Sequence, residues 1–172
     1  MRFYPSIGDR YITTLEFIEK VIPGGSRILD LGTRNKFTEL LTDSGFILHN
    51  TGGEDLDENP LFVRSFEVDA VTALEILEHL VSPYVLLKNL PSNRLVATVP
   101  LRLWFAKAYN NSADLWDRHY HEFEDWQFDW LLEKAGWKII ERRKWTSPSS
   151  RLGFRTILRW LTPRYYGVYA ER

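Results

Sequence analysis

Hydrophobic residues along the chain alternate between segments with helical spacing and segments with the continuous or alternating spacing of strands. Leu15, Ile18 and Ile22 are spaced as on one helix face, which predicts a helix over residues 9–21 that ends before Pro23. The same patterns predict helices near 37–41, 80–90, 126–135 and 154–161, and strands near 27–32, 46–48, 68–74, 94–99, 137–145 and 165–170. Because the two kinds of element alternate, we expect an α/β fold with a doubly wound, mostly parallel, Rossmann-like sheet covered on both faces.

The length and composition fit a single globular domain that spans residues 1–172. Of these residues, 44% are hydrophobic and 26% are charged, a balance typical of folded proteins. The absence of cysteine excludes disulfides, thiolate metal ligands and a cysteine nucleophile. No apolar run reaches the roughly 18 residues of a membrane helix, and the charged N-terminal segment lacks the hydrophobic region of a secretion signal. We therefore expect a cytoplasmic protein without a transmembrane segment.

Positive charge is concentrated towards the C-terminus. Residues 138–172 contain nine Lys and Arg residues against two acidic residues, so this part carries a charge of +7 and the rest of the chain −8. Arg151, Arg155 and Arg159 form a stripe beside the apolar stripe of the expected helix 154–161, as in helices that lie in a membrane interface. Two interpretations stay open: a solvated helix face, or peripheral contact with a membrane surface or nucleic-acid phosphate.

A strand, an acidic residue, a glycine and a helix follow one another near residue 30. Asp30 lies at the end of the first expected strand, and Gly32 precedes the next helix. In open α/β sheets, ligands bind beyond the carboxyl ends of the strands, and the first turn of a helix offers free backbone N–H groups. Gly32 lets a ligand approach the backbone, and Asp55, after the second expected strand, can accept hydrogen bonds from ribose hydroxyls. This order favours a nucleoside ligand.

Several later segments resemble class I S-adenosylmethionine-dependent methyltransferases. Residues 66–80, which include Glu75-Ile76-Leu77-Glu78-His79-Leu80, resemble the fourth strand of that family and its following loop, and residues 96–100 resemble its fifth strand. His121-Glu122-Phe123, followed by Leu132-Glu133-Lys134-Ala135-Gly136-Trp137, resembles the stretch before the family's C-terminal antiparallel hairpin. The resemblance extends from Arg27 to Ala170.

The resemblance implies S-adenosylmethionine as the cofactor. Asp30 and Gly32 would frame its methionine part, and Asp55, or alternatively Glu54, would hold its ribose. The residues implied to contact the cofactor are Asp30, Gly32, Thr33, Arg34, Asp55, Leu74 and Glu75.

Two departures from the family pattern concern this site. The family's loop usually reads Asp-x-Gly-x-Gly-x-Gly, whereas Arg34 and Lys36 replace the second and third glycines here. Arg34 either pairs with the carboxylate of the cofactor or fills the pocket. Only thirteen residues separate Asp55 from Asp69, too few for a crossover helix and a strand together. We therefore expect the family's third strand to be missing, which leaves about six strands and a more open adenine side.

Glu75, Glu78, His79 and His121 combine carboxylates and imidazoles, which are ligands of hard or borderline divalent metals. The Glu-x-x-Glu-His piece and the later His-x-Phe-Glu piece are similar to metal-dependent small-RNA 2′-O-methyltransferases, in which the metal would orient two hydroxyls of the acceptor. Ubiquinone-pathway O-methyltransferases share the first piece, and many methyltransferases resemble it without using a metal. The candidate catalytic residues are His121 and His79, and in the absence of a metal His121 would be the general base.

The sequence thus predicts an S-adenosylmethionine-dependent methyltransferase that acts on an oxygen nucleophile of a small-molecule or RNA acceptor. One alternative is a catalytically inactive protein of the same fold with a binding or regulatory role, which Arg34, Lys36 and the short 55–69 segment motivate. Another is a module that binds membrane or nucleic-acid phosphate through its basic C-terminal helix.

Overall fold

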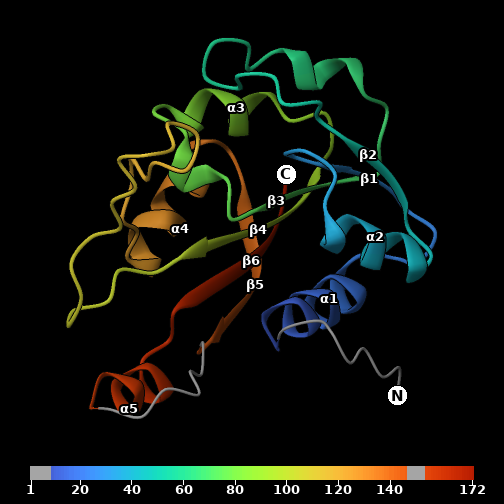
Figure 1. The fold of residues 1–172 in the computed structure, drawn as a ribbon. Helices are drawn as coiled ribbons and strands as arrows, with labels where there is room; N and C mark the ends of the chain where they lie inside the picture. Colours follow the sequence, from blue (N-terminus) through green and yellow to red (C-terminus); the bar gives the residue numbers. More distant parts are fainter. Residues whose placement is uncertain (1–8, 147–153) are drawn as a thin grey trace.

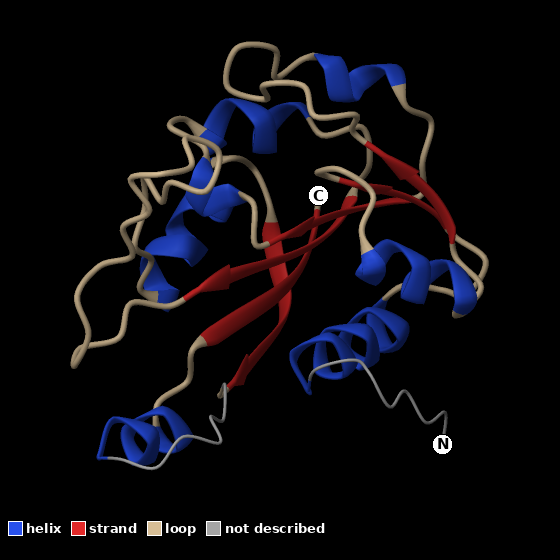
Figure 2. Cartoon of the chain, viewed as in Figure 1, coloured by secondary structure: helices blue, strands red, loops and turns tan. Residues whose placement is uncertain are grey.

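The computed structural model describes residues 9–146 and 154–172, in which helices and strands alternate (Figures 1 and 2). The strands are β1 (Arg27–Asp30), β2 (Ile47–Asn50), β3 (Ala70–Leu74), β4 (Arg94–Pro100), β5 (Lys138–Trp145) and β6 (Tyr165–Glu171). The helices are α1 (Asp9–Val21), α2 (Lys36–Asp43), α3 (Pro83–Asn89), α4 (Asp125–Lys134) and α5 (Phe154–Leu161), with short 3-10 helices η1 (Phe62–Ser65) and η2 (Leu77–His79). Each predicted element is present; α1 and α5 have the predicted bounds, and the others have shifted ends. The largest shift is at α3, which starts at Pro83 because proline fits the first turn of a helix.

The six strands form one sheet in the order β2-β1-β3-β4-β6-β5. β2, β1, β3 and β4 are parallel, whereas β6 is antiparallel to both β4 and β5. The predicted mostly parallel sheet with a C-terminal antiparallel hairpin is confirmed. The missing strand is confirmed as well, because only η1 lies between β2 and β3 and β2 forms the edge of the sheet. The strand order reverses between β1 and β3, where open α/β sheets bind their ligands.

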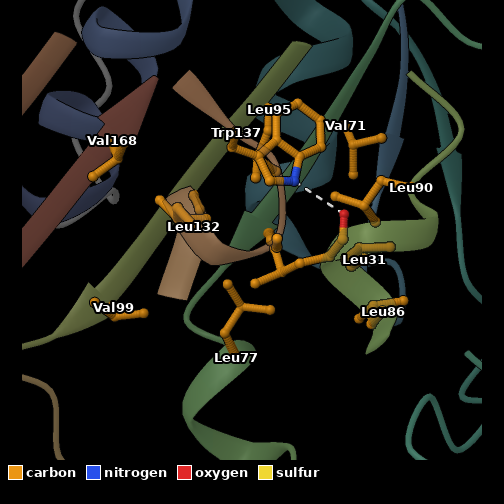
Figure 3. Packing of buried hydrophobic residues seen from close by; sticks show 14 of the residues in the cluster. Leu31, Val71, Leu77, Leu86, Leu90, Leu95, Val99, Leu132, Trp137 and Val168 are labelled. Carbon is orange, nitrogen blue, oxygen red and sulfur yellow. Dashed lines mark hydrogen bonds between the residues drawn. The ribbon is translucent and has the colours of Figure 1, made fainter. Parts of the chain in front are cut away.

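Helices cover both faces of the sheet, with α3 and α4 on one face and α1 and α2 on the other (Figure 1). The core on the α3 and α4 side includes Leu77, Leu132 and Trp137 (Figure 3). Trp137 is fully buried, and its Nε1 donates a hydrogen bond of 3.0 Å to the carbonyl of Leu87. None of the helices in the described part of the chain has the length and apolar character needed to span a bilayer.

Asn35 caps the start of α2. Its Oδ1 accepts hydrogen bonds from the backbone N–H groups of Phe37 (2.8 Å) and Thr38 (3.3 Å), and Thr38 Oγ1 accepts one from the Asn35 N–H (3.3 Å). Asn35→Ala removes the first two bonds, and we expect the free energy of unfolding, measured in urea, to fall by about 1 kcal/mol. Lys36→Ala changes an exposed neighbour and should alter it by less than about 0.5 kcal/mol. Equal losses in the two variants would contradict the role of the cap.

Candidate functional site

A cavity of about 140 Å³ lies at the carboxyl ends of β1 and β3, at the point where the strand order reverses. α1 and the start of α2 close it on one side. The residues that line it are Arg10, Tyr11, Thr14, Asp30, Leu31, Asn35, Phe37, Leu74, Glu75, Thr98 and Trp145. The cavity therefore lies where the topology of an open α/β sheet places a ligand.

Asp30 fixes the end of β1 through bonds to three neighbouring elements. Its Oδ1 accepts from Thr72 Oγ1 of β3 (2.7 Å), and its Oδ2 accepts from Asn50 Nδ2 of β2 (3.0 Å) and Thr38 Oγ1 of α2 (3.3 Å). Burial raises the pKa of Asp30 to about 6, although these three hydrogen bonds oppose the shift. The carboxyl group thus holds the loop that follows β1 in a fixed position against β2, β3 and α2.

The loop after β1 leaves the cavity open despite its bulky residues. Gly32 has a φ of 113°, a conformation that disfavours residues with a side chain. Its N–H donates a 2.7 Å hydrogen bond to Thr51 Oγ1, which joins this loop to the segment after β2. Arg34 and Lys36 are exposed, and neither lines the cavity. In this structure Arg34 therefore does not fill the pocket.

Glu75 places a buried carboxyl group in the cavity. Its φ of 54° lies in the left-handed region, which costs a residue with a side chain about 1 to 2 kcal/mol. Its N–H donates to the Thr98 carbonyl (3.0 Å), whereas its Oε1 is buried without a hydrogen-bond partner. Burial raises the pKa of Glu75 to about 7, against the opposing effects of the Arg10 charge and a hydrogen bond from Thr98. Strain and an unpaired buried acceptor at one residue are typical of a ligand-binding position.

Arg10 and Trp145 complete the cavity, and the sequence analysis did not identify either of them. The Arg10 guanidinium lies 4.9 Å from the centre of the Tyr11 ring and 5.4 Å from that of Tyr165. The Trp145 ring stacks on Tyr165 at 5.9 Å, and its Nε1 is buried without a partner. The sequence does mark Arg10 as unusual, because a positive charge in the first turn of a helix is unfavourable beside the positive end of the helix dipole. Trp145 comes from a distant strand, and no local pattern marks it.

Three residues that line the cavity carry groups able to bind a polar ligand: Glu75 with an unpaired acceptor, Trp145 with an unpaired donor and Arg10 with a cation. Within the described ranges, four buried side-chain polar atoms have no hydrogen-bond partner, and two of the four belong to these cavity residues. Because buried polar groups are nearly always paired, these two residues are candidates for contact with a ligand.

Other residues implied to contact the cofactor lie outside the cavity. Asp55 is exposed, and its Oδ1 accepts from the backbone N–H groups of Asp57 (3.0 Å) and Glu58 (3.3 Å). Glu54 is also exposed, and its Oε2 accepts from the Gly52 N–H (2.6 Å). Both acids thus stabilise turns of their own segment. Of the residues implied to contact the cofactor, Asp30, Leu74 and Glu75 line the cavity, whereas Gly32, Thr33, Arg34 and Asp55 do not.

The four residues of the predicted metal set are divided between different surroundings. Glu78 and His79 lie together with His119, and the potential ligand atoms of these three residues are all within 4.8 Å of one another. Neither Glu75 nor His121 belongs to this group. His119 joins it because the chain brings residues 118–121 against η2, where His79 Nδ1 lies 3.1 Å from the Arg118 carbonyl. Metal binding by the predicted set stays a prediction, and His119 was not part of that set.

Charge and burial act strongly on this histidine group. Burial raises the pKa of Glu78 well above its ordinary value, and the neighbouring charge of Glu75 adds to the shift. Burial also lowers the pKa of His119, with a further contribution from His79, whose ring contacts that of His119 edge-on at 4.7 Å. His119 therefore favours its neutral form.

His121 occupies a different site from the cavity around Glu75. Its ring stacks on Phe123 at 5.4 Å, and its Nε2 lies 3.3 Å from the Val81 carbonyl. It lines a separate, more open cavity of about 400 Å³ that also involves Tyr84 of α3 and Gln127 of α4. The predicted general base and the predicted cofactor residues thus face different cavities.

Known structures match this fold, although no family model and no curated protein matches the sequence. The chain is similar to the 1,6-didemethyltoxoflavin-N1-methyltransferase of Burkholderia thailandensis, solved with 1,6-didemethyltoxoflavin and S-adenosylhomocysteine (TM-score 0.68, 16% identity, 95% of this chain and 78% of that chain). It is also similar to an S-adenosylmethionine-dependent methyltransferase of Archaeoglobus fulgidus (TM-score 0.62, 16% identity, 94% of each chain).

A third similar structure belongs to the [4+2]-cyclase SpnF (TM-score 0.56, 14% identity, 94% of this chain and 81% of that chain). The chain therefore has the class I S-adenosylmethionine-dependent methyltransferase fold, as the resemblance predicted. One fold can host different reactions, so the argument for a function depends on the residues of the cavity.

Proposed function

We propose that this protein is an S-adenosylmethionine-dependent methyltransferase and that the cavity around Glu75 holds the methionine end of the cofactor. The observation that carries the proposal is the pair of unpaired buried atoms, Glu75 Oε1 and Trp145 Nε1, beside the Arg10 cation. The fold supports it, because similar solved structures include methyltransferases, one of them with S-adenosylhomocysteine bound.

The chemistry of the cavity fits this part of the cofactor. The methionine end carries a carboxylate, for which Arg10 is the cationic partner, and an ammonium group, for which Glu75 is the anionic partner. A cavity of about 140 Å³ is smaller than the roughly 300 to 1,000 Å³ that enclose a drug-sized ligand. It therefore suits the amino-acid end alone, and the nucleoside would extend past Gly32 towards the edge strand β2.

The bound cofactor supplies a methyl group on a cationic sulfur. Transfer of this group to an acceptor atom would be an in-line displacement in which the sulfur keeps the electron pair of the broken bond. The residues of the chain hold the donor in one orientation, which accounts for much of the acceleration in reactions of this kind. His121 and His79 lie outside the cavity, so in this proposal they belong to the acceptor side, where His121 is the candidate base for a hydroxyl proton.

Calorimetric titration with S-adenosylhomocysteine tests the proposal. We expect saturable binding at one site per chain, and weaker binding of 5′-methylthioadenosine, which lacks the amino-acid end. A lack of saturable heat with S-adenosylhomocysteine would contradict the proposal. In a second assay, the protein is incubated with S-adenosylmethionine, and small-molecule and RNA fractions are added in turn. If the cofactor binds but no S-adenosylhomocysteine forms, the result would favour the alternative of a catalytically inactive binding protein.

A further inference from the structure

Large apolar side chains are exposed on the two segments that meet where β4 ends and β6 begins. On α5, Trp160 is 61% exposed and Leu161 is 75% exposed, and Trp104, which follows β4, is 74% exposed. A backbone hydrogen bond joins the two segments, because the Leu101 N–H donates to the Arg164 carbonyl at 2.7 Å. α5 extends away from the sheet at this end (Figure 1). Large apolar side chains exposed to this extent are candidates for an interaction surface.

The positive charge of the C-terminal part is distributed unevenly between β5 and α5. On β5, three basic residues form ion pairs within the fold: Arg142 with Asp129, Arg143 with Glu16, and Lys144 with Asp125. Arg159 on α5 is exposed, and no ion pair is recorded for it in the described part of the chain. No acidic residue occurs between Glu141 and Glu171. Positive charge and apolar surface are thus combined on α5.

We propose that α5 and the adjoining loop after β4 dock onto a membrane surface that contains anionic phospholipids. Arg159 complements the headgroup charge, while Trp160 and Leu161 enter the boundary between headgroups and acyl chains. A single-stranded RNA would also match the charge and the tryptophans. It offers no partner for exposed aliphatic side chains such as Leu161 and Leu115, the latter 65% exposed in the loop after β4, so the lipid surface is the better fit.

The position of α5 connects this surface to the cavity. The chain leaves the sheet at Trp145, which lines the cavity, and returns at Tyr165, which stacks on Trp145. A membrane bound by α5 would therefore lie beside the cavity. The docking proposal does not depend on methyl transfer, because the residues expected to contact the membrane are not residues of the cavity.

Flotation of the full chain with lipid vesicles tests the proposal. We expect binding to vesicles of phosphatidylcholine and phosphatidylglycerol in equal parts, little binding to phosphatidylcholine alone, and a decrease with rising salt. Arg159→Glu should weaken binding by about fivefold or more, since one basic residue near an anionic surface contributes about that factor. The double variant Trp160→Ser with Leu161→Ser should weaken it by about tenfold or more.

Trp130→Ser with Lys134→Glu is the matched control, because it removes an exposed tryptophan and reverses an exposed positive charge on α4, where Trp130 is 64% exposed and Lys134 is exposed. This control should bind vesicles as the unchanged protein does. The proposal is overturned if neither vesicle binds, if the control loses as much binding as the α5 variants, or if an RNA homopolymer binds more tightly than anionic vesicles. Self-association that the α5 variants abolish, without any vesicle binding, also overturns it. Circular dichroism verifies that each variant is folded, and Arg159→Glu provides an independent test because it exposes no core residue.

Discussion

Replacing Glu75 with glutamine should make the protein more stable and at the same time weaken its binding of S-adenosylhomocysteine. The pKa of this carboxyl group is about 7 in the fold against 4.5 in the unfolded chain. Below pH 4.5 both states are protonated, so the group has no effect on stability there. As the pH rises from 4.5 to 7, the unfolded state ionises first and the native state loses stability relative to it. Above pH 7 the loss is complete, at about 3 kcal/mol for a shift of this size.

Urea denaturation at several pH values measures this effect. The free energy of unfolding of Glu75→Gln should exceed that of the unchanged protein by about 3 kcal/mol at pH 8 and should equal it near pH 4. Glu67→Gln is the control, because Glu67 is exposed, and it should show no difference at either pH. A gain of the same size at both pH values, or no gain at pH 8, would show that the buried charge of Glu75 is not the cause.

The same variant should bind S-adenosylhomocysteine about 10- to 100-fold less tightly, because a hydrogen bond to a charged group contributes about 1.5 to 3 kcal/mol. A residue whose replacement improves stability and impairs binding is one that the fold retains for its function. Glu75 combines the features that lead to this expectation: strain in its backbone, burial of its carboxyl group and an unpaired oxygen beside a cavity.

The fold could be predicted from the sequence because its signals are local. The apolar spacing of α1 and α4 and the short apolar runs of β1 and β4 each determine an element within a few residues. The missing strand could also be predicted, since the thirteen residues between Asp55 and Asp69 limit what the chain can form there.

The cavity was only half predictable, because its residues come from segments that are far apart in the chain. Asp30 ends β1 and Glu75 directly follows the neighbouring parallel strand β3, so the topology alone brings them together. Arg10 and Trp145 reach the same cavity from the first helix and from a strand of the C-terminal hairpin, and their meeting depends on how these elements pack. The histidines show the same limit, since His119 and His121 are two residues apart and yet face different surroundings.

Arg10, rather than Arg34, should be the residue that binds the carboxylate of the ligand. Arg10 lines the cavity beside Glu75, whereas Arg34 is exposed outside it. Arg10→Gln should therefore raise the dissociation constant of S-adenosylhomocysteine by about 30-fold, the loss of one charged hydrogen-bonding partner. Arg34→Gln makes the identical chemical change in the neighbouring loop and should leave this constant within about twofold.

A second ligand separates loss of a contact from distortion of the site. 5′-Methylthioadenosine carries the nucleoside and the sulfur without the carboxylate, so Arg10→Gln should leave its affinity unchanged in the same calorimetric titration. Weaker binding of both ligands by Arg10→Gln would mean that the variant disturbs the cavity as a whole, for example through the contacts of Arg10 with the rings of Tyr11 and Tyr165. Weaker binding of S-adenosylhomocysteine by Arg34→Gln alone would assign the carboxylate to Arg34, and the methionine end would then lie in the loop after β1 instead of the cavity beneath α1.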